Sequence, residues 1–292
     1  MIDEVALLVN PRSGQGGGAA TAVRALRFLR AAGVSVRVLV GRDATEAQAL
    51  AHRAVAAGTG ALVACGGDGI VNLALQAVAG TGTPFAVIPS GTGNDHARML
   101  GVPRHDPIAA ARVLLDGVAR PIDLGRAGDR WFGTVFAGGF DAKVTERTNR
   151  LRWPRGKLRY NLALVAELAA LRPLHYELEL DGERVSTSGV LVAVGNGASY
   201  GGGMRVCPGA VPDDGLFDVT VLGAVPLARL VRLLPRIYPG THVARPEVTT
   251  YRARRVRLSA PDVVGYADGE RFAPLPLVCE CVPRAATALV PS

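Results

Sequence analysis

Apolar runs and segments of helical spacing alternate over the first 125 residues of the chain. Each run is short and nearly free of charge, as buried strands are, and in the segments between them apolar residues recur every three or four positions. The pattern predicts strands at 5–10, 34–40, 61–65 and the start of 84–95, and helices at 19–32, 44–58 and 69–79. Strands that alternate with helices indicate an α/β domain with a parallel sheet.

The pattern changes after residues 119–125. One segment, 158–171, has helical spacing, and the remainder consists of short runs separated by glycine, proline and aspartate, which favour antiparallel hairpins. We expect strands within 131–140, 175–185, 189–197, 216–222, 254–260 and 277–282. The sequence therefore predicts an N-terminal α/β domain of residues 1–124 and a β-rich domain of residues 125–277.

Composition excludes several classes of protein. Of the 292 residues, 49% are hydrophobic, which is enough for a packed core and too much for a disordered chain. No apolar run approaches the ~18 residues of a membrane span, and the N-terminus lacks the basic start of a signal peptide. Four scattered cysteines do not form a disulfide framework. We expect a cytoplasmic protein with reduced thiols.

The net charge of +8 is compatible with nucleic acid, anionic lipid or an anionic cofactor as the partner. Nucleic acid is disfavoured because aromatic residues, which stack on bases, are only 5% of the chain. Residues 147–160 combine six basic residues with Leu151, Trp153 and Tyr160, a composition suited to an anionic membrane surface. The alternative is a solvated loop and the start of a helix.

Three glycine loops fall at the carboxyl ends of predicted strands, where α/β proteins bind ligands. They are NPRSG at 10–14, GGDG at 66–69 and PSGTGND at 89–95. The only side chain of the second loop is Asp68. It can lie beside a phosphate if a divalent cation lies between them, or if it accepts hydrogen bonds while backbone amides hold the phosphate. The alternative is that Asp68 belongs to a β-turn. The chain has no lysine before Lys143, which excludes a Walker A loop. The three loops together predict a nucleotide site.

Carboxylates also cluster in the second half of the chain. Asp213, Asp214 and Asp218 surround a glycine turn, where they could ligate a hard cation or lie in solvent on a hairpin. Asp268 and Glu270 surround another glycine, either as a hairpin turn or as a carboxylate base. The five histidines are scattered along the sequence, so a general base is expected to be a carboxylate.

Seven motifs in this order resemble the diacylglycerol kinase catalytic family, which comprises soluble bacterial lipid kinases related to sphingosine kinases and, more distantly, to NAD kinases. They are NPRSG, GGDG with its following Asn, PSGTGNDHAR, IDLG, GGFDA, GNGASYGGGMRVCPGAVPDDGLFDV and DGE, and they extend from residue 10 to about residue 270. The resemblance implies an N-terminal α/β domain with a parallel sheet and a C-terminal β-sandwich-like domain, with ATP and lipid meeting in the cleft between them. It also implies that the C-terminal segment, 278–292, returns to the first domain.

The resemblance also implies roles for individual residues. Glu270 would accept the proton of the lipid hydroxyl with Asp268 close by, and Asp68 and Asp95 would join a network of water and Mg²⁺ around the phosphates. Asp214, with the carbonyls of Val211 and Leu216, would hold a structural Mg²⁺. The nucleotide-binding residues would be Asn10, Pro11, Arg12, Ser13, Gly14, Gly66, Gly67, Asp68, Gly69, Ile70, Asn72, Gly91, Thr92, Asn94 and Asp95.

The chain departs from the family pattern where Ile70 and Leu73 replace a usual Thr and Glu, and where Val38 or Val40 replaces a Thr. The function expected is ATP- and Mg²⁺-dependent phosphorylation of diacylglycerol at the inner face of the membrane. The alternatives are another lipid acceptor, such as sphingosine or ceramide, or a catalytically silent nucleotide-binding regulator. NAD phosphorylation is disfavoured by GGFDA and DGE. The oligomeric state stays open, with a homodimer as one option.

Overall fold

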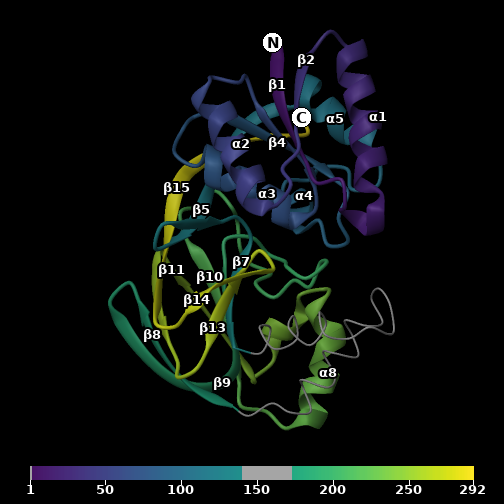
Figure 1. The fold of residues 1–292 in the computed structure, drawn as a ribbon. Coiled ribbons are helices and arrows are strands. Elements are labelled where there is room, and N and C mark those ends of the chain that lie inside the picture. The colour runs from purple at the N-terminus through teal and green to yellow at the C-terminus, as the bar shows by residue number, and fades with distance from the viewer. Residues whose placement is uncertain (1, 140–172) are drawn as a thin grey trace.

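The computed structural model describes residues 2–139 and 173–292. Its N-terminal part alternates strands and helices, as the hydrophobic pattern predicts (Figure 1). The strands are β1 (Glu4–Val9), β2 (Ser35–Leu39), β3 (Leu62–Gly66), β4 (Pro84–Pro89) and β5 (Val118–Ala127). The helices are η1 (Gly14–Gly16), α1 (Gly18–Ala31), α2 (Ala44–Ala56), α3 (Asp68–Val78), α4 (Asp95–Met99) and α5 (Pro107–Asp116).

The first four strands form a parallel sheet in the order β2-β1-β3-β4. Helices cover both faces, with α1 beside α5 on one face and α2 beside α3 on the other (Figure 1). From β1 the sheet runs to β2 in one direction and to β3 in the other. The order therefore reverses between β1 and β3, and a crevice opens there at the carboxyl ends of the strands.

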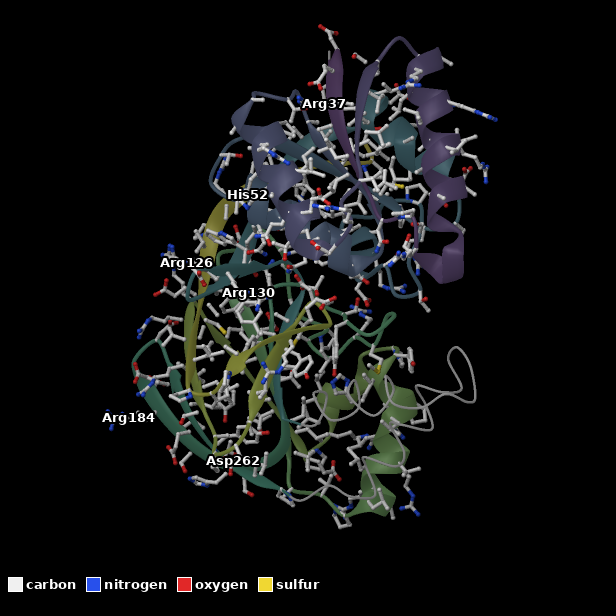
Figure 2. The ribbon with its side chains drawn as sticks, viewed as in Figure 1. Arg37, His52, Arg126, Arg130, Arg184 and Asp262 are labelled. Carbon is white, nitrogen blue, oxygen red and sulfur yellow. The ribbon has the colours of Figure 1, made fainter. Side chains whose placement is uncertain are left out.

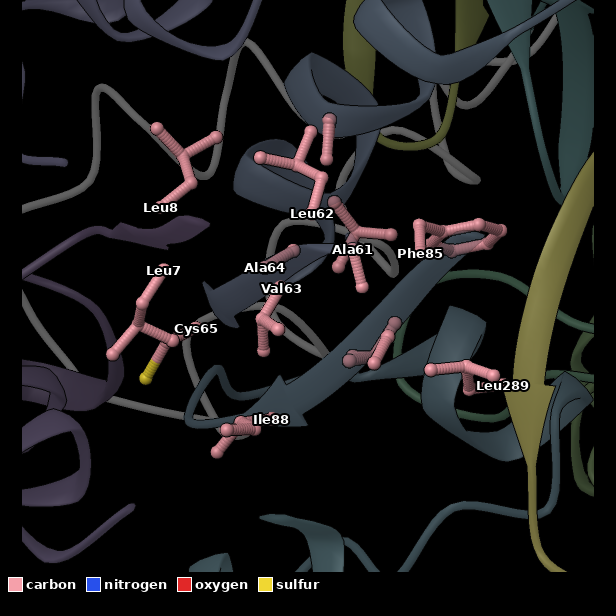
Figure 3. Packing of buried hydrophobic residues seen from close by; sticks show 14 of the residues in the cluster. Leu7, Leu8, Ala61, Leu62, Val63, Ala64, Cys65, Phe85, Ile88 and Leu289 are labelled. Carbon is pink, nitrogen blue, oxygen red and sulfur yellow. The ribbon is translucent and has the colours of Figure 1, made fainter. Parts of the chain in front are cut away.

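Side chains of the strands fill the core between the helical layers. Leu7, Leu62, Phe85 and Ile88 are almost completely buried; Leu62 and Phe85 lie on one face of the sheet, and Leu7 and Ile88 lie on the other (Figure 3). Side chains at the N-cap position help to determine where a helix begins. Asp43 accepts a hydrogen bond from the amide of Glu46 at the start of α2, which satisfies one of the free donors of the first turn.

The C-terminal part is mainly antiparallel. Its strands are β6 (Arg130–Phe132), β7 (Val135–Gly139), β8 (Leu174–Leu180), β9 (Glu183–Gly195), β10 (Phe217–Gly223), β11 (Val248–Ala253), β12 (Arg255–Ser259), β13 (Val264–Ala267), β14 (Glu270–Pro274) and β15 (Leu277–Val290). Asp-Gly pairs join β8 to β9 and β13 to β14, with positive φ at Asp181, Gly182, Asp268 and Gly269. Two consecutive residues with positive φ suit a tight hairpin, so the predicted turn at Asp268 and Gly269 is confirmed.

Strand β15 joins the two parts of the molecule. Its first half pairs with β12, and near its end Thr287 and Ala288 pair in parallel with Pro84 and Phe85 of β4. Both chain ends therefore lie in the α/β part (Figure 1). The fold class is as expected, whereas the exact limits of the two domains stay a prediction.

The sequence pattern missed one helix of the C-terminal part, α8 (Leu227–Ile237), followed by the short helix η2 (Thr241–Ala244). Helix α8 carries Pro235 and follows Pro226, and both prolines argued against a helix. The predicted helix at 158–171 and the basic segment 147–160 lie outside the described residues. Among the helices that are described, none has the length and apolar character needed to cross a bilayer.

Candidate active site

A cavity of about 940 Å³ opens at the crevice between β1 and β3 and is lined by residues of both parts of the chain. From the predicted nucleotide site it includes Asn10, Pro11, Arg12, Ser13, Gly14, Gly67, Gly69, Ile70, Asn72 and Gly91. The segment from Val40 to Gln48 lines one side, and Arg130, Glu270 and Arg271 come from the C-terminal part. Gly66, Asp68, Thr92, Asn94, Asp95 and Asp268 are not part of the lining.

The loop after β1 is held tightly against the loop after β4. The hydroxyls of Ser13 and Ser90 lie 2.6 Å apart, and Gly14 has a φ of 58°. A Cβ atom on Gly14 would lie 2.1 Å from the carbonyl oxygen of Ser90, so only glycine fits. The loop therefore brings its backbone to the cavity wall, as a phosphate-binding loop does.

Asp68 is the first residue of α3 and its side chain is 19% exposed. Its Oδ1 accepts a hydrogen bond from the amide of His96 at 3.1 Å, and Nδ1 of His96 lies at the same distance. His96 belongs to α4, so this contact ties the start of α3 to the loop after β4.

Asp268 is the buried partner on the other side of His96. Its Oδ2 accepts hydrogen bonds from Asn72 Nδ2 at 2.8 Å and the amide of Gly133 at 2.9 Å, and its Oδ1 accepts from the amide and hydroxyl of Thr134 at 2.8 and 2.6 Å. Nε2 of His96 lies 3.4 Å from Oδ2, which is within ion-pair range but without hydrogen-bond geometry. The carboxylate is therefore fully surrounded by donors.

The two acids determine the charge of His96. Burial by itself would lower the pKa of His96, but Asp268 and Asp68 outweigh it and raise the pKa to about 10. Burial likewise disfavours the charged form of Asp268, but His96 and the hydrogen bonds from Thr134 and Gly133 lower the pKa of this carboxyl below its ordinary range. The imidazolium therefore bridges two carboxylates from different parts of the chain.

Glu270 reaches across the cavity from β14 to the first turn of α3. A Cβ atom on Gly69 would lie 3.1 Å from Oε1 of Glu270. Burial raises the pKa of Glu270. The positive charge of Arg130 lowers this pKa and the negative charge of Asp268 raises it, and the resulting pKa lies above the ordinary value for a glutamate. Arg130 lies at the level where the two parts meet (Figure 2) and is held 4.1 Å above the ring of Phe272. A carboxylate with a raised pKa in a cleft is a candidate acid or base.

The loop after β4 uses its polar side chains for its own structure. Asn94 has a φ of 54°, accepts a hydrogen bond from the amide of Gly91 and donates one to its carbonyl. Asp95 is 4% exposed, accepts from the hydroxyl of Ser199 at 3.0 Å and the amide of Gly202 at 2.7 Å, and lies 3.5 Å from Arg98. Thr92 is exposed. Of the two acids predicted to lie near Mg²⁺, Asp68 has the more open carboxylate.

The predicted structural metal site contains an arginine contact. Asp214 accepts a hydrogen bond from the amide of Leu216 at 3.1 Å and pairs with Arg252, which also lies 3.4 Å from Asp218. No cluster of three or more His, Cys, Asp or Glu side chains suited to a metal occurs within 2–139 and 173–292. Asp214 can offer both oxygens to a cation only if Arg252 moves aside, so this site stays a prediction.

The departures from the family pattern make one wall of the cavity apolar. Ile70 is 6% exposed and packs over Gly66, where a Cβ atom would lie 2.3 Å from its Cγ2. Val40 is 51% exposed, and Leu73 also lines the cavity. Val38 is exposed but is not among the lining residues.

His96 and Arg130 are the residues that sequence reasoning missed. The only signal for His96 was its position directly after Asp95 in a glycine motif, and its partners are distant in sequence. Arg130 is one of many arginines in a chain with only two lysines, so no single arginine could be singled out from the sequence.

Comparison with known proteins finds family matches over both parts of the chain. Residues 4–127 match the diacylglycerol kinase catalytic domain, and residues 133–290 match the YegS C-terminal NAD kinase beta sandwich-like domain. A diacylglycerol kinase of Mycobacterium tuberculosis is 46% identical, with 99% of this chain and 96% of the relative aligned. A diacylglycerol kinase of Bacillus subtilis is 33% identical, with 74% and 72% aligned.

The fold also has solved counterparts. The crystal structure of a diacylglycerol kinase from Bacillus anthracis superposes with a TM-score of 0.81 at 24% identity, and covers 99% of this chain and 97% of that one. This likeness shows the fold, while the family follows from the two domain matches and the close relatives. The chain therefore belongs to the diacylglycerol kinase family of lipid kinases.

Proposed function

We propose that the protein transfers the γ-phosphate of ATP to the hydroxyl of diacylglycerol and produces phosphatidic acid. The observation that carries the proposal is the position of Glu270, whose carboxylate faces Gly69 at the N-terminus of α3 across a cavity shared by both parts of the chain. A base from one part and a phosphate-binding helix end from the other are the groups that phosphoryl transfer requires.

The nucleotide would lie along the loops after β1, β3 and β4. Backbone amides near Gly14, Gly67 and Gly91, together with the positive end of α3, suit the phosphates. Arg12 also lines the cavity and adds positive charge without a P-loop lysine, whereas Arg42, a further lining residue, pairs with Glu46 at 2.9 Å. The adjacent wall of Val40 and Leu73 suits a purine ring.

Glu270 would act as the general base. As the lipid oxygen forms its bond to the γ-phosphorus, the bond from that phosphorus to the bridging oxygen of ADP breaks and the hydroxyl proton passes to Glu270. The raised pKa of Glu270 makes its carboxylate a better proton acceptor than that of an ordinary glutamate.

Asp268 would be a positioning residue. Its oxygens already accept four hydrogen bonds and its side chain is fully buried, so it has no free lone pair for substrate. It holds the hairpin that carries Glu270 against Asn72 of α3. His96 would fix Asp68 and Asp268 relative to each other.

Asp68 is the residue that would hold a Mg²⁺ ion near the phosphates, since its carboxylate is partly exposed and its Oδ2 points toward the backbone of Gly93. When bound, the ion would neutralise charge on the phosphates. Asp95 would orient the neighbouring loop, because its oxygens are engaged by Ser199 and Gly202. Asp214 with the carbonyls of Val211 and Leu216 stays our prediction for a second, structural Mg²⁺.

The acceptor and the place of action belong to the same proposal. The reaction would occur at the cytoplasmic face of the membrane, because diacylglycerol does not leave the bilayer. Sphingosine and ceramide are the alternative acceptors, and the protein could work as a homodimer.

The test is a panel of acceptors with γ-labelled ATP and Mg²⁺. Mixed micelles containing diacylglycerol, sphingosine or ceramide are incubated with the protein, and the labelled lipid is identified. Labelled phosphatidic acid as the main product is expected. If sphingosine or ceramide is labelled preferentially, that lipid is the acceptor instead of diacylglycerol. If the protein binds ATP but labels no lipid, the result supports the alternative of a catalytically silent nucleotide-binding regulator.

A further inference from the structure

Helix α8 packs onto the C-terminal sheet with one face only. Leu230 and Leu233 are 3% and 6% exposed, and they join a cluster of side chains from β7, β9 and β10. Leu234 and Ile237 are partly buried against the same cluster. These four residues have the i, i+3, i+4, i+7 spacing of a single helix face.

A second apolar stripe on α8 faces outward. Leu227, Val231 and Tyr238 are 44%, 46% and 51% exposed, and they are three of the nine exposed large hydrophobic residues of the described chain. At about 100° per residue they fall within an arc of roughly 40°, because Tyr238 continues the helical backbone with φ −62° and ψ −48°. Single exposed apolar residues need no explanation, but a stripe of them does.

Arginines occupy the side of α8 away from the core, and their arc begins roughly 100° beyond the edge of the apolar stripe. Arg229, Arg232 and Arg236 fall within an arc of roughly 60° at the same helical spacing. The chain has no Asp or Glu from Val219 to Pro246. Arg229 pairs with Glu247 at 3.2 Å, whereas Arg232 and Arg236 have no acidic partner within the described part of the chain.

We propose that this outward face of α8 docks the protein on an anionic lipid bilayer. Leu227, Val231 and Tyr238 would enter the region between head groups and acyl chains, while Arg232 and Arg236 contact lipid phosphates. A second copy of this chain fits the face less well, because it would bring like charges together. The inference rests on the proposed function in that a lipid acceptor has to be reached at a membrane surface.

Two double variants and one triple control variant test the proposal on the full-length protein. L227S/V231S removes apolar side chains, and R232Q/R236Q removes the unpaired charges while Arg229 and Glu247 stay in place. The control on α1 (V23S/R24Q/R27Q) loses a valine of similar exposure, 45%, and two exposed arginines. Binding is measured by co-sedimentation with vesicles of phosphatidylcholine alone or with 30% phosphatidylglycerol.

The wild type is expected to bind the anionic vesicles. R232Q/R236Q should bind them about 25-fold more weakly, at about fivefold for each arginine, and added salt should reduce that difference. L227S/V231S should bind about tenfold more weakly, and the α1 control should bind like the wild type. Equal binding by all four proteins, or an equal loss in the α1 control, would overturn the proposal.

Two further measurements separate docking from catalysis and from self-association. With a short-chain diacylglycerol below its micellar concentration, both α8 variants should match the wild-type rate, but on vesicles they should be slower. If the wild type binds vesicles but phosphorylates no lipid, the proposed function is wrong, whereas the proposed docking face of α8 is supported. If sedimentation shows a wild-type dimer that the α8 variants lose while they still bind vesicles, the face belongs to a dimer and the proposal is wrong.

Discussion

Nε2 of His96 lies 3.4 Å from Oδ2 of Asp268, although the two residues belong to different parts of the chain and their side chains are 1% and 0% exposed. The opposite side of the same imidazole faces Asp68 at the start of α3. A buried cation therefore holds together the two loops that border the cavity. The arrangement depends on charge, since each carboxylate favours the protonated ring.

Replacing His96 by phenylalanine should destabilise the protein. The ring shape is retained, but the buried carboxylate of Asp268 loses its cation, which typically costs about 3–5 kcal/mol. Urea unfolding of His96→Phe beside His52→Phe, where the wild-type histidine is exposed, measures the difference. A loss below about 1 kcal/mol in His96→Phe would show that the hydrogen bonds to Asp268 suffice without the imidazolium.

Adding a methyl group at Gly69 should displace the catalytic carboxylate. Its Cβ atom would lie 3.1 Å from Oε1 of Glu270, so the carboxylate has to move by a few tenths of an ångström. We expect the kcat of Gly69→Ala to fall by about tenfold, because small misplacements of reacting groups are costly. In a Glu270→Gln background, Gly69→Ala should lower kcat little further. If the effects of the two substitutions on kcat are fully additive, Gly69→Ala acts on the nucleotide and not on Glu270.

The pH profile should report Glu270. A base works only when ionised, so kcat/KM should fall as the pH drops through the pKa of Glu270, and this acidic limb should lie above the ordinary value of 4.5. A raised pKa means that folding favours the protonated carboxyl, a stabilisation that is lost as the pH rises. Glu270→Gln should therefore have a slightly higher Tm than the wild type at pH 7 and an equal Tm near pH 4. A lower Tm at pH 7 would contradict this account.

Arg252 should compete with Mg²⁺ for Asp214. The guanidinium pairs with this carboxylate, so Arg252→Gln should tighten Mg²⁺ binding by about tenfold and Asp214→Asn should abolish it at this site. Isothermal titration calorimetry measures both. Arg120→Gln is the matched control, because Arg120 pairs at 2.6 Å with the adjacent Asp213. Unchanged Mg²⁺ affinity in both Arg252→Gln and Asp214→Asn would remove the predicted site.

The strands of the α/β part could be predicted because parallel strands buried on both faces are continuous apolar runs, as in 61–65. Their order, and hence the switch point between β1 and β3, fixes where the glycine loops meet. The Asp-Gly turn at Asp268 could also be predicted, because few other pairs of residues adopt positive φ at two consecutive positions.

Other features depend on contacts that local patterns do not encode. The position of His96 between Asp68 and Asp268 requires the packing of three distant segments. Helix α8 carried the right spacing at Leu230, Leu233 and Ile237, but the prolines around it obscured the period. Asp268 is enclosed by donors while Glu270 faces the cavity because Asp268 is a residue of the turn, whereas Glu270 is the first residue of β14 and pairs with Ala267.

The central claim is that Glu270 accepts the proton of the lipid hydroxyl. The most direct test is the single-turnover rate of phosphate transfer from γ-labelled ATP to diacylglycerol by wild type, Glu270→Gln and the exposed control Glu183→Gln, all at saturating ATP. We predict that Glu270→Gln is slower by about 10²–10⁴-fold with unchanged ATP affinity, and that Glu183→Gln equals the wild type. Transfer by Glu270→Gln at the wild-type rate would contradict the account.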